Sequence, residues 1–380
     1  MKTVLITGSN GFIGRNLSEH LSAKEDVKVL SFDRSNSIEE LENRVLTSDF
    51  IFHIAGVNRP KNESDFQTDN TNLTSQIISI LKANDKKTPL LITSSTQAVS
   101  DNPYGVSKRL AEESVFEWNK ESGSPVYVFR LPGIFGKWSK PNYNSVVATF
   151  CHNIANGMPI EISDPNYVVT LSYIDDVVGE FTQLLSSTPD TTKSVSIQSI
   201  SKTFEVSLGE LSERIYALHS IRTSLVVPDL SDLLNKYLYA TYISYLDEGD
   251  FSYSLNKNVD ERGWLSEFIK SESFGQIFIS KTKPGITRGD HWHHTKIEKF
   301  LVVSGKAEIT FRNKLTESNH VIKYEVDGDE AKVLDIPTGY VHAIKNIGET
   351  DLVTIFWADE ILDKNRTDTY YEKVSKEDAL

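Results

Sequence analysis

Short apolar runs alternate with amphipathic segments through the first half of the chain. The runs are four to six residues long, which is typical of buried strands, and the segments between them repeat apolar residues every three or four positions, as helices do. The predicted strands cover residues 3–7, 27–32, 50–54, 90–93 and 126–130, and the predicted helices begin at Asn16 and cover residues 73–81 and 107–120. This alternation predicts an α/β fold, a parallel sheet with helices on both faces.

The pattern changes after about residue 204. Residues 186–203 are rich in Ser and Thr and predict a loop or an irregular strand, and helical patterns follow at 208–218 and 230–246. From residue 251 onward, short apolar runs are separated by Gly, Pro and Asp, at 266–270, 276–280, 300–303, 307–311, 332–336 and 352–357. Many short strands with turn residues predict an all-β barrel or sandwich. We therefore expect two domains, residues 1–246 and 247–380.

Composition narrows the class of protein. Hydrophobic residues make up 39% of the 380 residues, and the net charge of −13 argues against nucleic acid as a main partner, although a nucleotide ligand remains compatible with it. The single cysteine, Cys151, excludes an intramolecular disulfide and fits a reducing compartment. The N-terminus lacks the pattern of a signal peptide, and the apolar runs are too short to insert into a membrane. We expect a cytoplasmic protein.

A glycine-rich loop follows the first predicted strand and opens the first predicted helix. Its sequence is Gly8-Ser-Asn-Gly11-Phe-Ile-Gly14. Glycines allow the tight turn and let backbone N–H groups approach a pyrophosphate at a helix N-terminus, so the loop predicts a dinucleotide site, with a purely structural turn as the alternative. The cofactor-binding candidates here are Gly8, Asn10, Gly11, Phe12, Ile13 and Gly14.

Two charged residues, Asp33 and Arg34, close the second strand. An acid at this place binds a ribose hydroxyl of NAD, whereas an arginine accepts the 2′-phosphate of NADP. The pair favours NADPH if Asp33 turns aside and Arg34 holds the phosphate. The alternative is a solvated charge pair without a ligand.

Ser95, Tyr104 and Lys108 form a candidate catalytic group. Tyrosine has an ordinary pKa of about 10, so it is protonated at neutral pH and can give a proton to a carbonyl oxygen that is being reduced. A lysine about 4 Å away stabilises the resulting tyrosinate by roughly 4 kcal/mol at an effective dielectric constant of about 20. Ser95, at the end of the preceding strand, is expected to hydrogen-bond the carbonyl.

Four of the nine histidines, His291, His293, His294 and His342, lie in a 52-residue window of the second half that also contains His320. The alternation in His291-Trp292-His293 puts both imidazoles on one face of a strand, and Glu298 and His342 can reach the same point from neighbouring strands of a barrel. Three histidines and a carboxylate suit Zn²⁺ or a similar divalent metal. One alternative is a barrel that keeps its histidines without metal, one of them acting as a base. Another is that His293 hydrogen-bonds the substrate, which leaves His291, Glu298 and His342 as the firmer ligands. His294 is expected to face away from this site.

The first-half motifs resemble the extended short-chain dehydrogenase/reductase superfamily, and the second-half motifs resemble the cupin superfamily. The first resemblance covers residues 1–246 and implies a Rossmann-type doubly wound parallel sheet, with Ala55, Gly56, Tyr104 and Lys108 completing the cofactor site. It departs at Gly133, where many members carry a substrate-binding asparagine. The second resemblance implies a jelly-roll barrel and departs at Ala331, where a glycine is usual.

The whole chain is similar to the CapF-type family of capsular polysaccharide enzymes, through residues 53–60, 136–144 and 291–295. This resemblance implies a zinc-containing homodimer that acts on a UDP-linked 4-keto-6-deoxy amino sugar. Its substrate-binding candidates are Asn58, Arg59, Ser95, Arg130, Asn142 and Asn144. For the loop of Asn142 and Asn144, packing on its own domain is the alternative.

The resemblance also implies two consecutive reactions. The cupin epimerises C3 of a UDP-2-acetamido-2,6-dideoxy-4-hexulose, and the reductase then reduces C4 with NADPH to UDP-N-acetyl-6-deoxy-L-talosamine, on the route to UDP-N-acetyl-L-fucosamine. Chemistry fixes this order, because the C3 proton is acidic only while C4 is a ketone. Two alternatives remain: a reductase with a non-catalytic sugar-binding cupin, and a cofactor-sensing regulator, which has no need of Ser95, Tyr104 and Lys108 together.

Overall fold

The computed structural model describes residues 1–56, 71–186, 197–255, 258–260, 263–265, 269, 275–316, 320–360 and 367–375. The chain divides into two compact units. The first contains Met1–Phe135, Asn142–Ser145 and Val169–Glu205, and the second contains Gly136–Pro141, Val146–Val168 and Val206–Leu380. The division by contacts places residues 206–246 with the β-rich part of the chain. The domain boundary near residue 246, which rests on the sequence pattern, stays a prediction.

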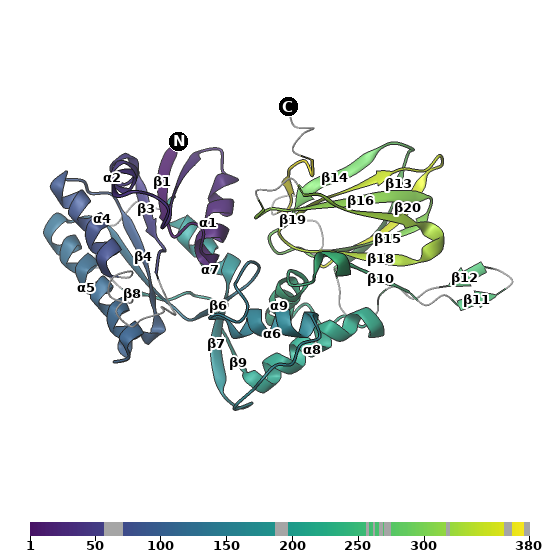
Figure 1. The fold of residues 1–380 in the computed structure, drawn as a ribbon, viewed down its shortest axis with the longest axis horizontal. Coiled ribbons are helices and arrows are strands. Elements are labelled where there is room, and N and C mark those ends of the chain that lie inside the picture. The colour runs from purple at the N-terminus through teal and green to yellow at the C-terminus, as the bar shows by residue number, and fades with distance from the viewer. Residues whose placement is uncertain are drawn as a thin grey trace. The chain divides into compact units, whose positions relative to one another are not determined.

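A parallel six-stranded sheet forms the centre of the first unit (Figure 1). Every paired neighbour in this sheet runs parallel, which confirms the predicted doubly wound α/β architecture. In spatial order the strands are β2 (Val27–Phe32), β1 (Lys2–Thr7), β3 (Phe50–His53), β4 (Leu90–Ser95), β5 (Val126–Leu131) and β8 (Ile197–Gln198).

Helices cover both faces of this sheet (Figure 1). Helix α1 packs with α7, whereas α4 packs with both α2 and α5. The apolar side chains of α2, α4 and α5 form one buried core with those of the sheet, in which Leu5, Ile51 and Trp118 are completely buried. The helices are α1 (Phe12–Ser22), α2 (Ile38–Thr47), α4 (Asn72–Ala83), α5 (Pro103–Ser122) and α7 (Ile174–Gln183). A small sheet joins β6 (Gly133–Phe135), β7 (Val168–Tyr173) and β9 (Phe204–Ser207).

The second unit contains two antiparallel five-stranded sheets, consistent with the predicted cupin-like barrel. One sheet has the order β10-β18-β15-β20-β13 and the other β17-β16-β19-β14-β21. The strands are β10 (Ser252–Ser254), β13 (Gln276–Thr282), β14 (Thr287–Trp292), β15 (Glu298–Ser304), β16 (Lys306–Asn313), β17 (Ile322–Asp327), β18 (Lys332–Ile336), β19 (Tyr340–Asn346), β20 (Leu352–Ala358) and β21 (Tyr370–Tyr371), and β11 (Asn258–Asp260) pairs separately with β12 (Gly263–Leu265). Of the predicted strand 266–270, only residue 269 is described, and it lies outside regular structure.

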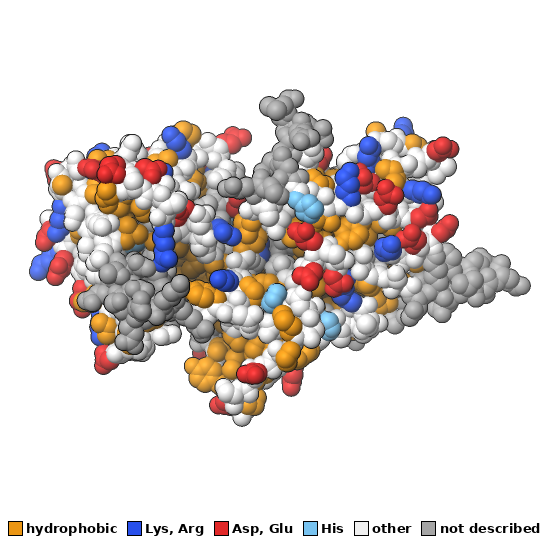
Figure 2. Space-filling model, viewed as in Figure 1, with side chains coloured by type: hydrophobic (Ala, Val, Ile, Leu, Met, Phe, Trp, Pro, Cys, Tyr) orange, Lys and Arg blue, Asp and Glu red, His pale blue; other side chains and the backbone are white. Residues whose placement is uncertain are grey.

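Three helices accompany these sheets: α6 (Val146–Ala155), α8 (Leu208–Ser224) and α9 (Leu233–Ile243), each packed against the other two. Among the described residues, no helix is both long and apolar enough to cross a membrane. Lys and Arg side chains are interspersed with Asp and Glu over the described surface seen in Figure 2, where no extended basic patch is visible.

Candidate cofactor, catalytic and metal sites

A cavity of about 870 Å³ opens where β1 leads into α1. This cavity is lined by all the cofactor-binding candidates from the glycine loop and from the ends of the next two strands. They are Gly8, Asn10, Gly11, Phe12, Ile13, Gly14, Asp33, Arg34, Ala55 and Gly56. Further lining residues that the sequence motifs did not nominate come from the β2–α2 turn and from α4, among them Ser35, Asn36, Asn72 and Gln76.

Close backbone packing explains two of the loop glycines. Gly8 has a φ of +70°, and a Cβ atom there would lie 2.8 Å from Cα of Ala55. A Cβ atom on Gly14 would lie 2.1 Å from the carbonyl oxygen of Gly8, so a side chain at this place would push α1 away from the loop. The glycines therefore bring the N-terminus of α1 to the cavity, where its N–H groups favour an anionic ligand such as a pyrophosphate.

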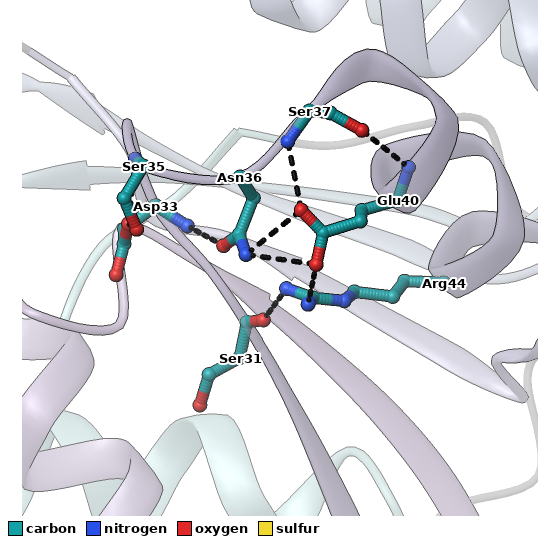
Figure 3. Close-up of polar contacts among 7 residues, drawn as sticks. All are labelled: Ser31, Asp33, Ser35, Asn36, Ser37, Glu40 and Arg44. Atoms are coloured by element: carbon teal, nitrogen blue, oxygen red, sulfur yellow. Dashed lines mark hydrogen bonds and ion pairs between the residues drawn. The ribbon is translucent and has the colours of Figure 1, made fainter.

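The turn after β2 is fixed by its own polar side chains (Figure 3). The carboxylate of Asp33 accepts hydrogen bonds from the Ser35 backbone N–H (2.8 Å) and hydroxyl (2.6 Å) and from the side-chain amide of Asn10. The bonds from Ser35 lower the pKa of Asp33. Asn36 accepts a hydrogen bond from the Asp33 backbone N–H (2.9 Å) and donates one to Glu40.

Helix α2 starts at a capping box next to this turn. Ser37 accepts a hydrogen bond from the backbone N–H of Glu40, and the Glu40 carboxylate accepts one from the backbone N–H of Ser37 (2.8 Å). Arg44 forms an ion pair with Glu40 (2.7 Å) and donates to the carbonyl of Ser31 in β2. The turn that carries Asp33 and Arg34 is therefore tied to both the strand before it and the helix after it (Figure 3).

The structure brings Ser95, Tyr104 and Lys108, the candidate catalytic group, close together. Ser95 ends β4, and α5 begins at Pro103, where the Asn102 side chain caps the helix by accepting from the Gly105 N–H (2.7 Å). Lys108 Nζ lies 5.9 Å from the centre of the Tyr104 ring and donates to the carbonyl of Thr93 (3.1 Å).

Burial dominates the ionisation of this group. Burial raises the pKa of Tyr104, and a hydrogen bond with Ser95 offsets part of the increase. Burial also lowers the pKa of Lys108 to about 8, against the opposing effect of the Glu112 carboxylate. At neutral pH the site therefore holds a protonated phenol beside an ammonium group that is close to its titration range.

Arg130 has a buried partner that sequence reasoning did not identify. Its guanidinium binds the Glu112 carboxylate through two hydrogen bonds of 2.9 and 2.7 Å, and Ser94 donates to the same carboxylate. Glu112 follows Lys108 by one helical turn, a spacing that could have indicated it. The predicted contact between Arg130 and the substrate stays a prediction. In the structure, the Arg130 guanidinium is already paired with Glu112.

The structure describes only two of the four other substrate-binding candidates. Asn58 and Arg59 lie outside the described residues. Asn142 and Asn144 are exposed in the segment between β6 and α6, and Asn142 has a φ of 54°. Trp138, from the same segment, packs closely on Gly339. A Cβ atom added to Gly339 would lie 3.0 Å from the indole ring of Trp138.

His53 is a core residue, as its apolar strand suggested. Its ring bridges the hydroxyls of Thr7 (2.7 Å) and Thr74 (2.8 Å). Burial lowers its pKa to about 3, helped by the nearby charge of Lys108, so the ring is neutral at physiological pH. We assign His53 to the support of β1, β3 and α4 rather than to catalysis.

The four metal-ligand candidates form one cluster in the second unit. One nitrogen or oxygen of each residue lies within 4.8 Å of the others, across His291, His293, Glu298 and His342. Oxygen Oε2 of Glu298 is 3.4 Å from Nε2 of His293 and 3.4 Å from Nε2 of His342. His294 points elsewhere, with its ring 4.5 Å from that of Trp292 and 5.0 Å from that of Tyr370.

This donor set fits a divalent metal ion. The buried Nε2 atoms of His293 and His342 form no hydrogen bond within the described part of the chain, although both face Glu298. Ligand atoms about 2.1 Å from one ion are at most about 4.2 Å apart, so small side-chain adjustments suffice to close the cluster around it. Burial lowers the pKa of His291 to about 4. Burial also opposes ionisation of Glu298, but the neighbouring His293 and His342 outweigh this effect and keep the pKa of the Glu298 carboxyl well below its ordinary value. Neutral imidazoles and an ionised carboxylate are the forms that bind metal.

Comparisons with known proteins cover the whole chain. Residues 4–195 match the NAD dependent epimerase/dehydratase family, and residues 258–370 match the polysaccharide biosynthesis C-terminal domain. The UDP-2-acetamido-2,6-beta-L-arabino-hexul-4-ose reductase of Pseudomonas aeruginosa is 43% identical over 367 residues, 97% of each chain. The crystal structure of the capsular polysaccharide assembling protein CapF from Staphylococcus aureus is 45% identical, with 97% of this chain and 99% of that chain covered and a TM-score of 0.66.

The fold of the first half also recurs in a more distant protein. UDP-glucuronic acid 4-epimerase from Bacillus cereus, solved with NAD, is 17% identical, with 57% of this chain and 83% of that chain covered and a TM-score of 0.51. At this identity the likeness shows the fold alone.

Proposed function

Because this chain belongs to the NAD-dependent epimerase/dehydratase family and also carries a polysaccharide biosynthesis C-terminal domain, we propose that it is a bifunctional UDP-sugar enzyme. Its first domain reduces the C4 ketone of a UDP-2-acetamido-2,6-dideoxy-4-hexulose, and its cupin-like domain epimerises C3 before that step. The product is UDP-N-acetyl-6-deoxy-L-talosamine, on the route to UDP-N-acetyl-L-fucosamine. The 43% identity to a reductase named for a 4-ketosugar supports the substrate class.

The grouping of Ser95, Tyr104 and Lys108 carries the assignment of reductase. NADPH, when bound, supplies the hydride that reaches C4. Tyr104 donates its phenolic proton to the C4 oxygen, which Ser95 holds by a hydrogen bond. The Lys108 ammonium, 5.9 Å from the ring centre, stabilises the developing tyrosinate by about 3 kcal/mol at an effective dielectric constant of about 20. Ser95 and Tyr104 are thus expected to act on the carbonyl, and Tyr104 and Lys108 also complete the cofactor site that the family resemblance implies.

The β2–α2 turn supports NADPH over NADH. Asn10 and Ser35 already donate to the Asp33 carboxylate, so this acid serves the turn and is less available to a ribose diol. Arg34, the neighbouring cation, lines the same cavity and suits a 2′-phosphate. A homodimer remains part of the proposal through the family resemblance.

The cluster of His291, His293, Glu298 and His342 carries the assignment of epimerase. A divalent ion such as Zn²⁺ held there supplies a positive charge that polarises a substrate oxygen. The neighbouring Tyr340 lies on the same strand as His342, and its hydroxyl bonds with Asn313 (3.3 Å). Burial, with a contribution from Glu248, raises the pKa of Tyr340 to about 12, so it suits proton donation rather than proton removal.

Two variants separate the two activities. Tyr104→Phe removes the proton donor, and we expect NADPH oxidation to fall by about 100-fold or more, while C3 proton exchange in D₂O continues. His291→Ala removes a candidate metal ligand, and we expect C3 exchange to be lost, while the pre-epimerised 4-ketosugar is still reduced. Spectrophotometry at 340 nm and proton NMR follow the two reactions, respectively.

The converse outcomes decide against each half of the proposal. Unchanged NADPH oxidation by Tyr104→Phe contradicts the role of the tyrosine. Unchanged C3 exchange by His291→Ala contradicts the assignment of epimerisation to the cupin-like domain, and it favours a sugar-binding module in its place.

A further inference from the structure

The C-terminal segment 368–374, which we call the C-terminal strap, lies along the strand that carries His291. Its strand β21 pairs with β14, so that Tyr371 is opposite His291 and Tyr370 is opposite Trp292. The strap therefore borders the histidine cluster directly, although Tyr371 is 80 residues further along the chain than His291.

The Asp368 carboxylate holds the turn that follows His291 and His293 and precedes Glu298. It accepts hydrogen bonds from the backbone N–H groups of His294 (2.9 Å), Thr295 (2.6 Å) and Lys296 (2.7 Å), and from the Thr295 hydroxyl (2.9 Å). This turn connects β14 to β15, so it sets the spacing between His293 before it and Glu298 after it. Four hydrogen bonds to one carboxylate make this a strong anchor.

The backbone carbonyl of Asp368 orients the His293 ring. Nδ1 of His293 contacts this carbonyl, and since a carbonyl can only accept, Nδ1 carries the proton. Nε2 is then the lone-pair nitrogen, and it faces Oε2 of Glu298 at 3.4 Å. The contact thus selects the tautomer in which His293 presents a metal-binding nitrogen to the cluster.

The far end of the strap is held independently of Asp368. The buried guanidinium of Arg312 donates to the Val374 carbonyl (2.9 Å) and pairs with Glu372, which also pairs with Lys314 (2.8 Å). The Glu372 backbone N–H donates to the carbonyl of Asp290 (2.8 Å). A substitution at Asp368 is therefore expected to loosen the turn without detaching the strap.

We propose that Asp368 is the positioning residue of the metal centre, which fixes both the His293 tautomer and the turn that separates His293 from Glu298. This inference rests on the proposed metal site. It adds that Asp368 holds two of the ligands in place in the metal-free protein. In metalloproteins generally, mutation of a residue that supports a metal ligand lowers the metal affinity by about 10- to 100-fold.

The test measures metal affinity rather than turnover. In Asp368→Asn, an amide group replaces one carboxylate oxygen and opposes the N–H donors, so we expect the Co²⁺ affinity of the full-length protein to fall by about 10- to 100-fold in chelator competition. We also expect a changed Co²⁺ d–d absorption spectrum, because the ligand geometry loosens. Asp327→Asn is the matched control: Asp327 caps a turn elsewhere in the same unit by accepting from Asp329 N–H (3.1 Å), and we expect it to keep wild-type affinity.

A milder variant covers the case in which Asp368→Asn does not fold. Thr295→Val removes only the hydroxyl donor at 2.9 Å and keeps the size of the side chain, so we expect a smaller loss, within about 10-fold. The positioning role alone is overturned if a folded Asp368→Asn keeps the wild-type Co²⁺ affinity and spectrum. If Asp368→Asn does not fold, the same result in Thr295→Val overturns it. A wild-type protein that binds no Co²⁺ overturns this role together with the proposed metal site, whereas the reductase assignment still depends on Tyr104→Phe.

Discussion

Burial controls the charge of the residues around the proposed reductase site. His53 and Lys108 both lose proton affinity because they are removed from water, and the pKa of His53 reaches about 3 while that of Lys108 reaches about 8. Burial raises the pKa of Tyr104 for the same reason. The result is a neutral histidine, a protonated phenol and a lysine whose charge is lost within an accessible pH range.

The pH dependence of reduction follows from Lys108. A lysine is cationic below its pKa, so its stabilisation of the tyrosinate is present at neutral pH and is lost as the pH rises through about 8. We expect kcat/KM for the 4-ketosugar to fall above about pH 8, by up to about tenfold per pH unit, under saturating NADPH.

Lys108→Arg provides the control for this profile. Its guanidinium stays charged at these pH values, so a slower enzyme without the decline near pH 8 is expected. A wild-type rate that stays constant up to about pH 10, or the same decline in Lys108→Arg, would show that another group controls the profile.

At the scale of elements, the proposed preference for NADPH depends on the turn between β2 and α2. Its conformation is fixed from both sides, by Asn36 and Glu40 within the α2 cap and by Arg44 on the β2 carbonyl of Ser31. If the proposed preference for NADPH holds, this turn is a preformed place for the 2′-phosphate, because little rearrangement is needed when the ligand binds.

Substitution of one cation in this turn tests the cofactor preference. Arg34→Ala removes a cation that lines the cavity, and we expect the ratio of kcat/KM for NADPH to that for NADH to fall by at least about 10-fold. Arg44→Gln removes an equal charge outside the lining and is expected to change the ratio by less than about twofold. Equal effects of the two substitutions would mean that net charge, not a contact of Arg34, determines the preference.

Elements with local signals were predicted well from sequence. The glycine loop, Ser95 at the end of β4 and Asp33 directly after β2 follow from patterns within a few residues, whereas α5 begins at Pro103, four residues before its predicted start at residue 107. Helices α2, α6 and α7 and strands β17 and β19 were not predicted. In β19 nearly every residue is buried, including the polar His342 and Asn346, so the alternation that marks a half-exposed strand is absent.

Partners that are distant in sequence were not predicted for a different reason. Glu112 meets Arg130 across 18 residues, and Asp368 meets Thr295 across 73. The only local signal for Glu112 is its spacing of one helical turn from Lys108, and nothing in the local pattern around Asp368 distinguishes it from a solvated surface charge. The cluster of His291, His293, Glu298 and His342 was accessible because motif spacing, rather than a single residue, carried the signal.

At the scale of the whole molecule, the chain combines two candidate sites, and the proposed function gives their reactions a fixed order. Because the C3 proton is acidic only beside a C4 ketone, the proposed epimerisation in the cupin-like domain comes before the proposed reduction removes that ketone. Each site is built within one compact unit, the catalytic group from β4 and α5 and the histidine cluster from β14, β15 and β19. Each activity is therefore expected to survive the loss of the other.

One NMR measurement tests this account most directly. The purified protein is incubated with the UDP-2-acetamido-2,6-dideoxy-4-hexulose in D₂O, first without and then with NADPH, and proton spectra are recorded over time. We predict that deuterium enters C3 without NADPH, and that the 6-deoxy-L-talosamine product formed after its addition carries deuterium at C3. Reduction of the ketosugar with the C3 proton fully retained would contradict the proposed two-step function.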